Sequence, residues 1–302
     1  MSQFPMEASK GAFKRQKSIF RSFINDESQF KPEKGRYHLY LSHACPWAHR
    51  TLIVRVLKGL ESTISVSFVN PVRNEKGWHF ESEDNQYLDP INGFSYLIEA
   101  YKIMDPQFDL RVTVPVLWDI ETGQIVNNES SEIIVMLNDR FNQFTDVNLN
   151  LYPKDLRAEI DELNQFVYSN INNGVYKCGF ASNQSVYDAE VTNLFKALDQ
   201  IELGLNGKKY LIGDLITLAD IRLFVTLIRF DVVYYNHFKT NHQHIYEYEN
   251  LWRFVKLLFN QEKIKPTVKL NEIKDHYYKT HPYINPSGIV PVGPNIEKHL
   301  RS

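Results

Sequence analysis

Cys45 occupies a position at which a cysteine is readily activated as a nucleophile. It lies in the run Leu-Ser-His-Ala-Cys-Pro-Trp-Ala-His-Arg (41–50), between an apolar and an amphipathic stretch. This pattern predicts a strand, a turn and a helix that begins at the thiol. Unpaired N–H groups and the positive end of the helix dipole favour a thiolate there, and Pro46 suits the first helical turn. The sequence therefore predicts a reactive thiolate. A buried, inert cysteine is the alternative.

The residue three positions after Cys45 limits what this thiolate can do. It is Ala48 rather than a second cysteine, so no neighbouring thiol can resolve a disulfide within the motif. A disulfide formed at Cys45 must therefore join it to a small molecule or to another chain.

The elements around this motif predict an α/β domain. The order is strand, helix, strand, then a hairpin and a helix, which is the order of a thioredoxin-like fold. A long polar stretch without clear periodicity separates the two halves, and insertions of this length tend to be functional or lid-like. The predicted strands are 37–41, 64–69, 114–119 and 124–126, the helices are 46–58 and 127 to about 141, and the polar stretch is 70–111.

Beyond residue 152 the pattern predicts helices alone. Helical spacing marks 156–171, 187–203, 218–235 and 250–259, and an extended tail starts at 280. Thr217 and Asp220 form a capping-box pattern before the third of these helices. We therefore predict an N-terminal arm (1–35), a thioredoxin-like domain (36–145) and an all-helical domain with an extended tail (150–302).

Composition narrows the class of protein. The chain has 302 residues, a net charge of -2 and two cysteines. The charge gives no reason to expect nucleic acid or an anionic membrane as a partner. The scarcity of cysteine fits a reducing compartment, so we expect a cytoplasmic protein. No spacing indicates a metal site, and His237, His242 and His244 are expected in a solvated loop.

The order of the two halves resembles the cytosolic glutathione transferase fold, and Gly-Asp-Leu-Ile-Thr-Leu-Ala-Asp (213–220) resembles the N-capping motif of its helical core. The run Cys-Pro-Trp-Ala-His-Arg (45–50) is similar to that of the glutathionyl-hydroquinone reductases, the Xi class of these transferases, which is related to the omega class. The likeness continues through 111–119, 127–134, 172–181 and 229–234. Leu110 departs from the family pattern, which has a glycine before the arginine.

The resemblance implies glutathione as co-substrate and assigns roles to particular residues. Cys45 would attack the sulfur of a glutathionyl-hydroquinone and hold a mixed disulfide with glutathione. Val114, before a cis-proline, would pair with the cysteinyl backbone of glutathione, and Glu129 and Ser130 would bind its γ-glutamyl end. Further glutathione contacts would be Trp78 and Arg111, the latter with the glycine carboxylate. Catalytic residues that would contact the aromatic ring are Tyr176, Tyr234 and Tyr277.

The leading hypothesis is thus a glutathione-dependent reductase of glutathionyl-hydroquinones, expected as a homodimer. An omega-like thioltransferase or dehydroascorbate reductase would use the same Cys45. A glutathione-transferase-like binding module without catalysis is a third possibility, and it would be indifferent to Cys45→Ala.

Overall fold

The chain forms two compact units in the computed structural model, which describes residues 8–9, 11–82 and 86–300. The sheet unit comprises Lys17–Asn150, and the helical unit comprises the described residues up to Gln16 together with those from Leu151 on. The predicted arm is therefore divided, because its part from Lys17 on packs with the sheet unit and its earlier part with the helical unit.

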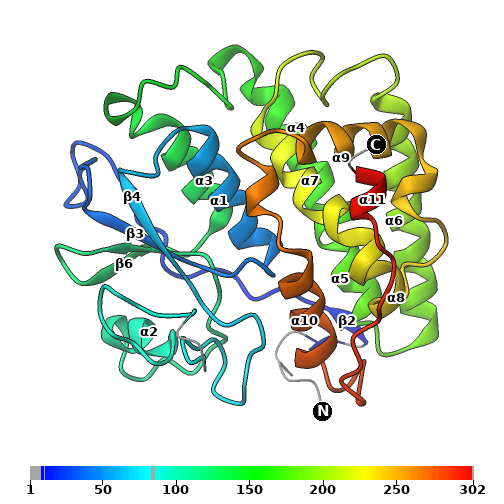
Figure 1. Ribbon diagram of the computed structural model, residues 1–302, viewed down its shortest axis with the longest axis horizontal. Helices are drawn as coiled ribbons and strands as arrows, with labels where there is room; N and C mark the ends of the chain where they lie inside the picture. The colour runs from blue at the N-terminus through cyan, green and yellow to red at the C-terminus, as the bar shows by residue number, and fades with distance from the viewer. Residues whose placement is uncertain (1–7, 10, 83–85, 301–302) are drawn as a thin grey trace. The chain divides into compact units, whose positions relative to one another are not determined.

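A four-stranded mixed sheet forms the sheet unit, in the order β4-β3-β5-β6 (Figure 1). β3 runs parallel to β4, with Tyr37 opposite Ile64, and antiparallel to β5, with Tyr37 opposite Asp119. A register shift between Leu117 and Trp118 interrupts the antiparallel pairing of β5 with β6. The strands are β3 (Tyr37–Leu41), β4 (Ile64–Phe68), β5 (Val116–Asp119) and β6 (Gln124–Asn127).

Three α-helices cover this sheet. α1 (Pro46–Leu57) and α3 (Ser130–Asp139) pack against each other on one side, and α2 (Ile98–Met104) lies on the other side (Figure 1). All five residues of β3 are buried, as expected for a central strand with both faces covered. The arrangement fixes the N-terminus of α1, which follows directly on β3, and that of α3, which follows on β6.

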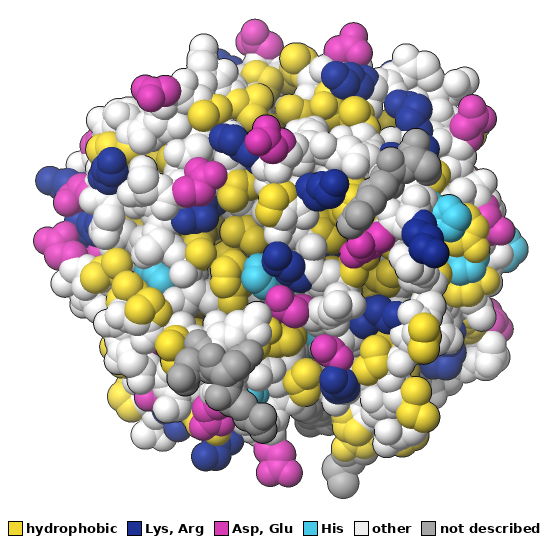
Figure 2. All heavy atoms as spheres, in the orientation of Figure 1, with side chains coloured by type: hydrophobic (Ala, Val, Ile, Leu, Met, Phe, Trp, Pro, Cys, Tyr) yellow, Lys and Arg dark blue, Asp and Glu magenta, His cyan; other side chains and the backbone are white. Residues whose placement is uncertain are grey.

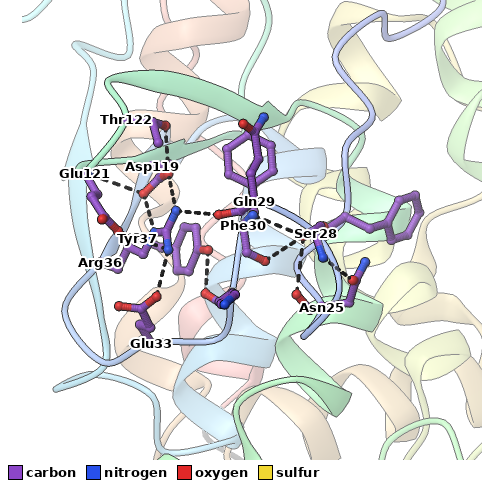
Figure 3. Close-up of polar contacts among 12 residues, drawn as sticks. Asn25, Ser28, Gln29, Phe30, Glu33, Arg36, Tyr37, Asp119, Glu121 and Thr122 are labelled. Carbon is purple, nitrogen blue, oxygen red and sulfur yellow. Dashed lines mark hydrogen bonds and ion pairs between the residues drawn. The ribbon is translucent and has the colours of Figure 1, made fainter.

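A buried ion pair ties the start of β3 to the end of β5. Arg36 donates from Nε to Asp119 Oδ1 and from Nη2 to Asp119 Oδ2, both at 2.8 Å (Figure 3). The Asp119 side chain is fully buried. Burial acts to raise the pKa of this carboxyl, but the bonds from Arg36 and Thr122 outweigh it and hold the pKa below its ordinary value. Figure 3 also shows the segment around Asn25 and Ser28, which folds through hydrogen bonds of its own.

The described residues of the helical unit form α-helices, two π-helical turns, one short ribbon of two strands and three short 3-10 helices (Lys154–Leu156, Ile245–Glu247 and Lys265–Thr267). The π-turns follow α4 and α7 directly, so each helix continues with a changed pitch. The elements are β1 (Ala8–Ser9), β2 (Ala12–Phe13), α4 (Arg157–Val167), the π-turn Tyr168–Asn172, α5 (Gly174–Gly179), α6 (Gln184–Gly204), α7 (Leu218–Arg229), the π-turn Phe230–Tyr234, α8 (Tyr235–His237), α9 (Glu249–Phe259), α10 (Leu270–Thr280) and α11 (Glu297–Leu300).

The predicted capping box at the start of α7 is confirmed. Asp220 Oδ2 accepts from the backbone N–H of Thr217 at 2.7 Å and from its hydroxyl at 2.9 Å. Its other oxygen accepts from the N–H of Leu211 at 2.8 Å. Asp220 is fully buried, and burial raises the pKa of its carboxyl to about 6, so these donors offset only part of the loss of its hydration.

The predicted fold class, a thioredoxin-like domain followed by helices, is confirmed. α2, α5 and α10 lie where no helix was predicted, and α11 lies in the tail that was predicted to be extended. The expectation that His237 is solvated is wrong: its side chain is buried, and its Nε2 lies 3.0 Å from His281 Nδ1. His244 likewise stacks on Tyr235 and pairs with Asp231.

Acidic and basic side chains alternate over the face shown in Figure 2, in keeping with the small net charge. In the part of the chain that the structure describes, no helix has the length and apolar character needed to cross a bilayer.

Candidate active site

Cys45 is the N-cap residue of α1, with extended backbone angles (φ -80°, ψ 121°). Its N–H donates to Ser42 O at 3.2 Å, and its carbonyl accepts from the N–H of His49 at 2.9 Å. The thiol is half-buried. At this position the N–H groups of the first helical turn and the helix dipole favour negative charge on sulfur.

The other thiol of the chain has a different environment. Cys178 on α5 is 2% exposed, and burial raises the pKa of its thiol to about 12. Both cysteines are reduced. A thiol so buried is inert near neutral pH, so Cys45 is the candidate for any chemistry of sulfur.

The loop before β5 brings Val114 to the thiol. Cys45 Sγ lies 3.6 Å from the carbonyl oxygen of Val114, and the Val114–Pro115 peptide bond is cis, as the resemblance implied. Earlier in the same loop, the charge of Arg111 acts on buried Tyr101. Burial raises the pKa of Tyr101, and the hydrogen bonds with Thr113 and Asn128, followed by the charge of Arg111, oppose that rise. Trp78, 6% exposed, packs under the guanidinium of Arg73, whose Cζ lies 5.3 Å from the ring centroid.

Glu129 and Ser130 lie at the start of α3, as the sequence indicated. Glu129 is the N-cap residue, and its Oε1 accepts from the N–H of Ser131 at 3.0 Å and from the Ser131 hydroxyl at 2.8 Å. Its Oε2 accepts from the Ser18 hydroxyl at 3.1 Å. Burial acts to raise the pKa of Glu129, but the charge of Arg50 and the hydrogen bonds from Ser131 and Ser18 hold it below the ordinary value.

Arg50 on α1 belongs to this group, and sequence reasoning missed it. Its Nε and Nη2 donate to Ser130 Oγ at 3.0 and 2.6 Å. Nη2 also lies 3.6 Å from Glu129 Oε1, and the arginine side chain is 1% exposed. In the sequence, Arg50 looks like any charged residue of an amphipathic helix. Its hydrogen-bond partner Ser130 lies 80 positions later in the chain, so no local pattern indicates the contact.

The helical unit brings the three predicted tyrosines together. Tyr277 on α10 is the central member, because its hydroxyl lies 2.7 Å from that of Tyr176 and 2.9 Å from that of Tyr234. We call these three residues the tyrosine chain. Tyr234 and Tyr277 are buried, whereas Tyr176 is partly exposed. Burial raises the pKa of both inner phenols well above the ordinary value, and the nearby Arg229 opposes it.

The first described residues of the helical unit cover the ring of Tyr176. Phe13 stacks on that ring with centroids 6.0 Å apart. The guanidinium carbon of Arg15 lies 4.7 Å from the Tyr176 centroid, while its Nε donates to Asn173 Oδ1 at 2.7 Å. A cation over the face of a phenol stabilises negative charge that develops on it.

A search of residues 8–9, 11–82 and 86–300 finds no group of three or more His, Cys, Asp or Glu side chains arranged to hold a metal ion.

Comparison with known proteins identifies the family of both halves. The N-terminal domain family of the glutathione S-transferases matches residues 44–140, and the C-terminal domain family matches residues 184–256. The chain is 48% identical to the glutathionyl-hydroquinone reductase PcpF of Sphingobium chlorophenolicum, over 96% of this chain and 92% of that protein. It is 44% identical to the glutathionyl-hydroquinone reductase YqjG of Escherichia coli, over 96% and 92%.

Solved structures agree. The crystal structure of the glutathione S-transferase Xi from Phanerochaete chrysosporium has a TM-score of 0.91 and 51% identity, covering 94% of this chain and 98% of that one. The glutathione-bound structure of YqjG from Escherichia coli has a TM-score of 0.88 and 44% identity, covering 91% and 92%. On this evidence the chain belongs to the glutathione S-transferase family and, within it, to the Xi class.

Proposed function

We propose that this protein is a glutathionyl-hydroquinone reductase, an oxidoreductase that removes glutathione from aromatic conjugates and uses glutathione as co-substrate. The observation that carries the proposal is the placement of Cys45 at the N-terminus of α1, 3.6 Å from Val114 O. It occurs in a chain that is 48% identical to one glutathionyl-hydroquinone reductase over nearly its full length.

In the first step, the Cys45 thiolate attacks the sulfur of the conjugate. The new S–S bond joins Cys45 to glutathione, and the bond between that sulfur and the ring carbon breaks. The electron pair of the broken bond stays with the ring, which takes up one proton at that carbon and leaves as the hydroquinone. The ring is thereby reduced, and the two sulfurs are oxidised to the mixed disulfide.

In the second step, the thiolate of another glutathione attacks the sulfur of the bound glutathione. Oxidised glutathione leaves, and the Cys45 thiolate is restored. Ala48 supports this order of events, because a cysteine at that position would compete with glutathione for the mixed disulfide.

For glutathione itself, we assign the cysteinyl backbone to the main chain of Val114. The γ-glutamyl carboxylate is assigned to Ser130 and the N–H groups that begin α3, and the γ-glutamyl ammonium to Glu129. Arg111 is assigned to the glycine carboxylate, and Trp78 is assigned as a further glutathione contact. Support comes from the lowered pKa of Glu129, which keeps that carboxyl ionised for an ammonium partner.

The tyrosine chain is assigned to the aromatic substrate. Phenol hydroxyls can donate to hydroquinone oxygens and stabilise the negative charge that develops on the ring as the C–S bond breaks. Support comes from the two hydroxyl contacts of Tyr277. Through them the two buried tyrosines can donate hydrogen bonds toward Tyr176 while Tyr176 donates to the substrate.

Steady-state turnover tests the function. Purified protein with glutathione should convert glutathionyl-menadione or a glutathionyl-benzohydroquinone to the free hydroquinone and oxidised glutathione. A clear preference for dehydroascorbate would instead favour the omega-like thioltransferase. This alternative is worth testing because omega-like glutathione S-transferases of two yeasts are 46% and 40% identical to this chain. No turnover of either substrate, with glutathione still bound, would indicate a binding module.

The proposal includes a homodimer in the cytoplasm. The dimer rests on the family resemblance, and light scattering coupled to gel filtration would measure its mass. The compartment rests on the chemistry, because Cys45 must be kept reduced between turnovers. Fractionation of the source cells, with an antibody to this chain, would test it.

A further inference from the structure

We propose that Arg50 is the residue that makes Ser130 select a carboxylate, so that Arg50 sets the specificity for the γ-glutamyl end of glutathione without touching it. The inference rests on the proposed function, since it concerns the same glutathione site. It is carried by the hydrogen bonds within the sheet unit.

The argument begins with the bonding capacity of a hydroxyl. Ser130 Oγ has one proton and two lone pairs, and a guanidinium can only donate. Arg50 donates to this oxygen twice, from Nε at 3.0 Å and from Nη2 at 2.6 Å. Both lone pairs of Ser130 Oγ are therefore engaged, and its proton must point toward an acceptor other than Arg50. A hydroxyl fixed in this way can donate to a ligand but cannot accept from one.

Burial strengthens the selection. Ser130 is 3% exposed and Arg50 is 1% exposed, so water competes little for the hydroxyl proton. Among the groups at the γ-glutamyl end, the carboxylate accepts and the ammonium only donates. Ser130 thus favours the carboxylate and rejects the ammonium.

Arg50 also supports the complementary partner. Its Nη2 lies 3.6 Å from Glu129 Oε1, and its charge helps to keep that carboxyl ionised. One guanidinium therefore gives two adjacent residues opposite roles, Ser130 as a donor and Glu129 as an acceptor. An amino acid end with one carboxylate and one ammonium fits this pair.

Arg50 further connects this pair to the reactive thiol. It lies on α1, the helix that Cys45 caps, while Ser130 begins α3. The forked contact fixes the start of α3 relative to the helix that carries the sulfur. A lysine could supply the charge but not the planar fork.

The test compares three ligands on Cys45→Ser protein, which binds glutathione without exchange. Calorimetry gives Kd for glutathione, for 4-aminobutyryl-cysteinyl-glycine, which lacks the γ-glutamyl carboxylate, and for glutaryl-cysteinyl-glycine, which lacks the ammonium. With Arg50 present, loss of the carboxylate should weaken binding on the order of ten- to a hundredfold, as for a hydrogen bond to a charged group.

Arg50→Lys should cut this carboxylate preference severalfold while the ammonium preference changes by less than about twofold, because the charge beside Glu129 remains. Ser130→Ala should remove the part of the carboxylate preference that the hydroxyl supplies and leave the part that the N–H groups at the start of α3 supply, and adding Arg50→Lys to it should change nothing more. Arg55→Lys is the matched control: it makes the same substitution in the same helix, where the arginine Nε instead donates to Ile64 O at 2.6 Å. This control should leave both preferences intact.

The inference is overturned if Arg50→Lys keeps the full carboxylate preference, or if both preferences fall in parallel, as a general loosening would cause. Should Arg50→Lys not fold, Arg50→Gln takes its place: an unchanged carboxylate preference overturns the inference, and a fall in that preference larger than the fall in the ammonium preference supports it. Lack of turnover with both binding preferences intact would reject only the proposed function. Failure of the parent protein to bind glutathione would reject both.

Discussion

The thiol of Cys45 and the carbonyl of Val114 lie 3.6 Å apart, although 69 residues separate them in the sequence. The two ends of this contact come from different parts of the sheet unit, the N-terminus of α1 and the loop before β5. A tripeptide whose cysteinyl backbone pairs with Val114 would thereby present its sulfur close to Cys45. This relationship makes the thiol the first target for mutation.

Replacing Cys45 with alanine should abolish the covalent intermediate. Intact mass spectrometry after treatment with a glutathionyl-hydroquinone should show one glutathione adduct on the native chain and none on Cys45→Ala. Turnover should fall by about three orders of magnitude or more, as for removal of a nucleophile. Cys178→Ala is the matched control and should keep both the adduct and the activity, because Cys178 is buried with its pKa raised. An adduct on Cys45→Ala would contradict the mechanism.

Replacing Tyr277 with phenylalanine should break the tyrosine chain at its centre. It removes two hydroxyl contacts, of 2.7 and 2.9 Å, and leaves two phenols without their shared partner. We expect a loss of about 1–3 kcal/mol in the free energy of unfolding and a lower kcat for the hydroquinone conjugate, with Kd for glutathione unchanged. Tyr278→Phe on the same helix is the control, since the contacts of its hydroxyl are long, 3.5 Å to Val232 O and 3.4 Å to Asn236 Nδ2. Equal losses of kcat in both variants would contradict the assignment.

Two buried histidines should make the fold sensitive to acid. Burial lowers the pKa of His38 and of His237 from 6.5 to about 4. Between about pH 4 and 6.5 the unfolded chain binds more protons at these rings than the folded chain does. Their contribution is therefore fully present above pH 6.5 and is lost as the pH falls toward 4, by up to about 3 kcal/mol for each ring.

Urea unfolding at a series of pH values checks this expectation. His38→Asn should flatten the dependence of the unfolding free energy on pH in this window, compared with the native chain. The asparagine can still bond to Ser65, whose hydroxyl oxygen lies 2.7 Å from His38 Nδ1. An unchanged slope in the variant would show that His38 is not responsible.

Removing the carboxylate of Asp220 should destabilise the helical unit strongly. Asp220→Ala leaves the buried N–H groups of Thr217 and Leu211 without their acceptor, at about 1–3 kcal/mol each. Thr217→Ser keeps a capping hydroxyl and serves as the mild control. Thermal unfolding followed by circular dichroism measures both. A loss in Asp220→Ala no larger than that in Thr217→Ser would argue against this role of the capping box.

Sequence analysis predicted well those helices and strands in which the spacing of apolar residues follows directly from burial, either of one face or of the whole element. β3 was predicted at 37–41, where it is found, because a strand buried on both faces gives a run of residues that is apolar apart from His38. α10 was missed because Asn271, Glu272, Lys274 and Asp275 surround its few apolar positions. The π-turn Phe230–Tyr234 was predicted as part of one helix, since a wider turn leaves no local signature.

Site residues could be predicted where a local sequence motif defines them. They could not be predicted where a contact between distant parts of the chain defines them. Cys45 and Glu129 follow from local rules on helix N-termini. Arg50 does not, because nothing near it in the chain indicates that a residue 80 positions later will bury its charge. The error at His237 has the same origin, since its partner His281 lies 44 positions away, beyond the helix that was missed.

The tyrosine chain has a property that no single phenol has. The Tyr277 hydroxyl has one proton, so it can donate a hydrogen bond to Tyr176 or to Tyr234 but not to both at once. If an oxyanion accepts a hydrogen bond from the Tyr176 hydroxyl, then the Tyr277 hydroxyl donates to Tyr176, and the Tyr234 hydroxyl donates to Tyr277. The three O–H bonds would then all point toward Tyr176. Negative charge on a ligand at Tyr176 would thereby change the orientation of the buried Tyr234 hydroxyl without any movement of the helices.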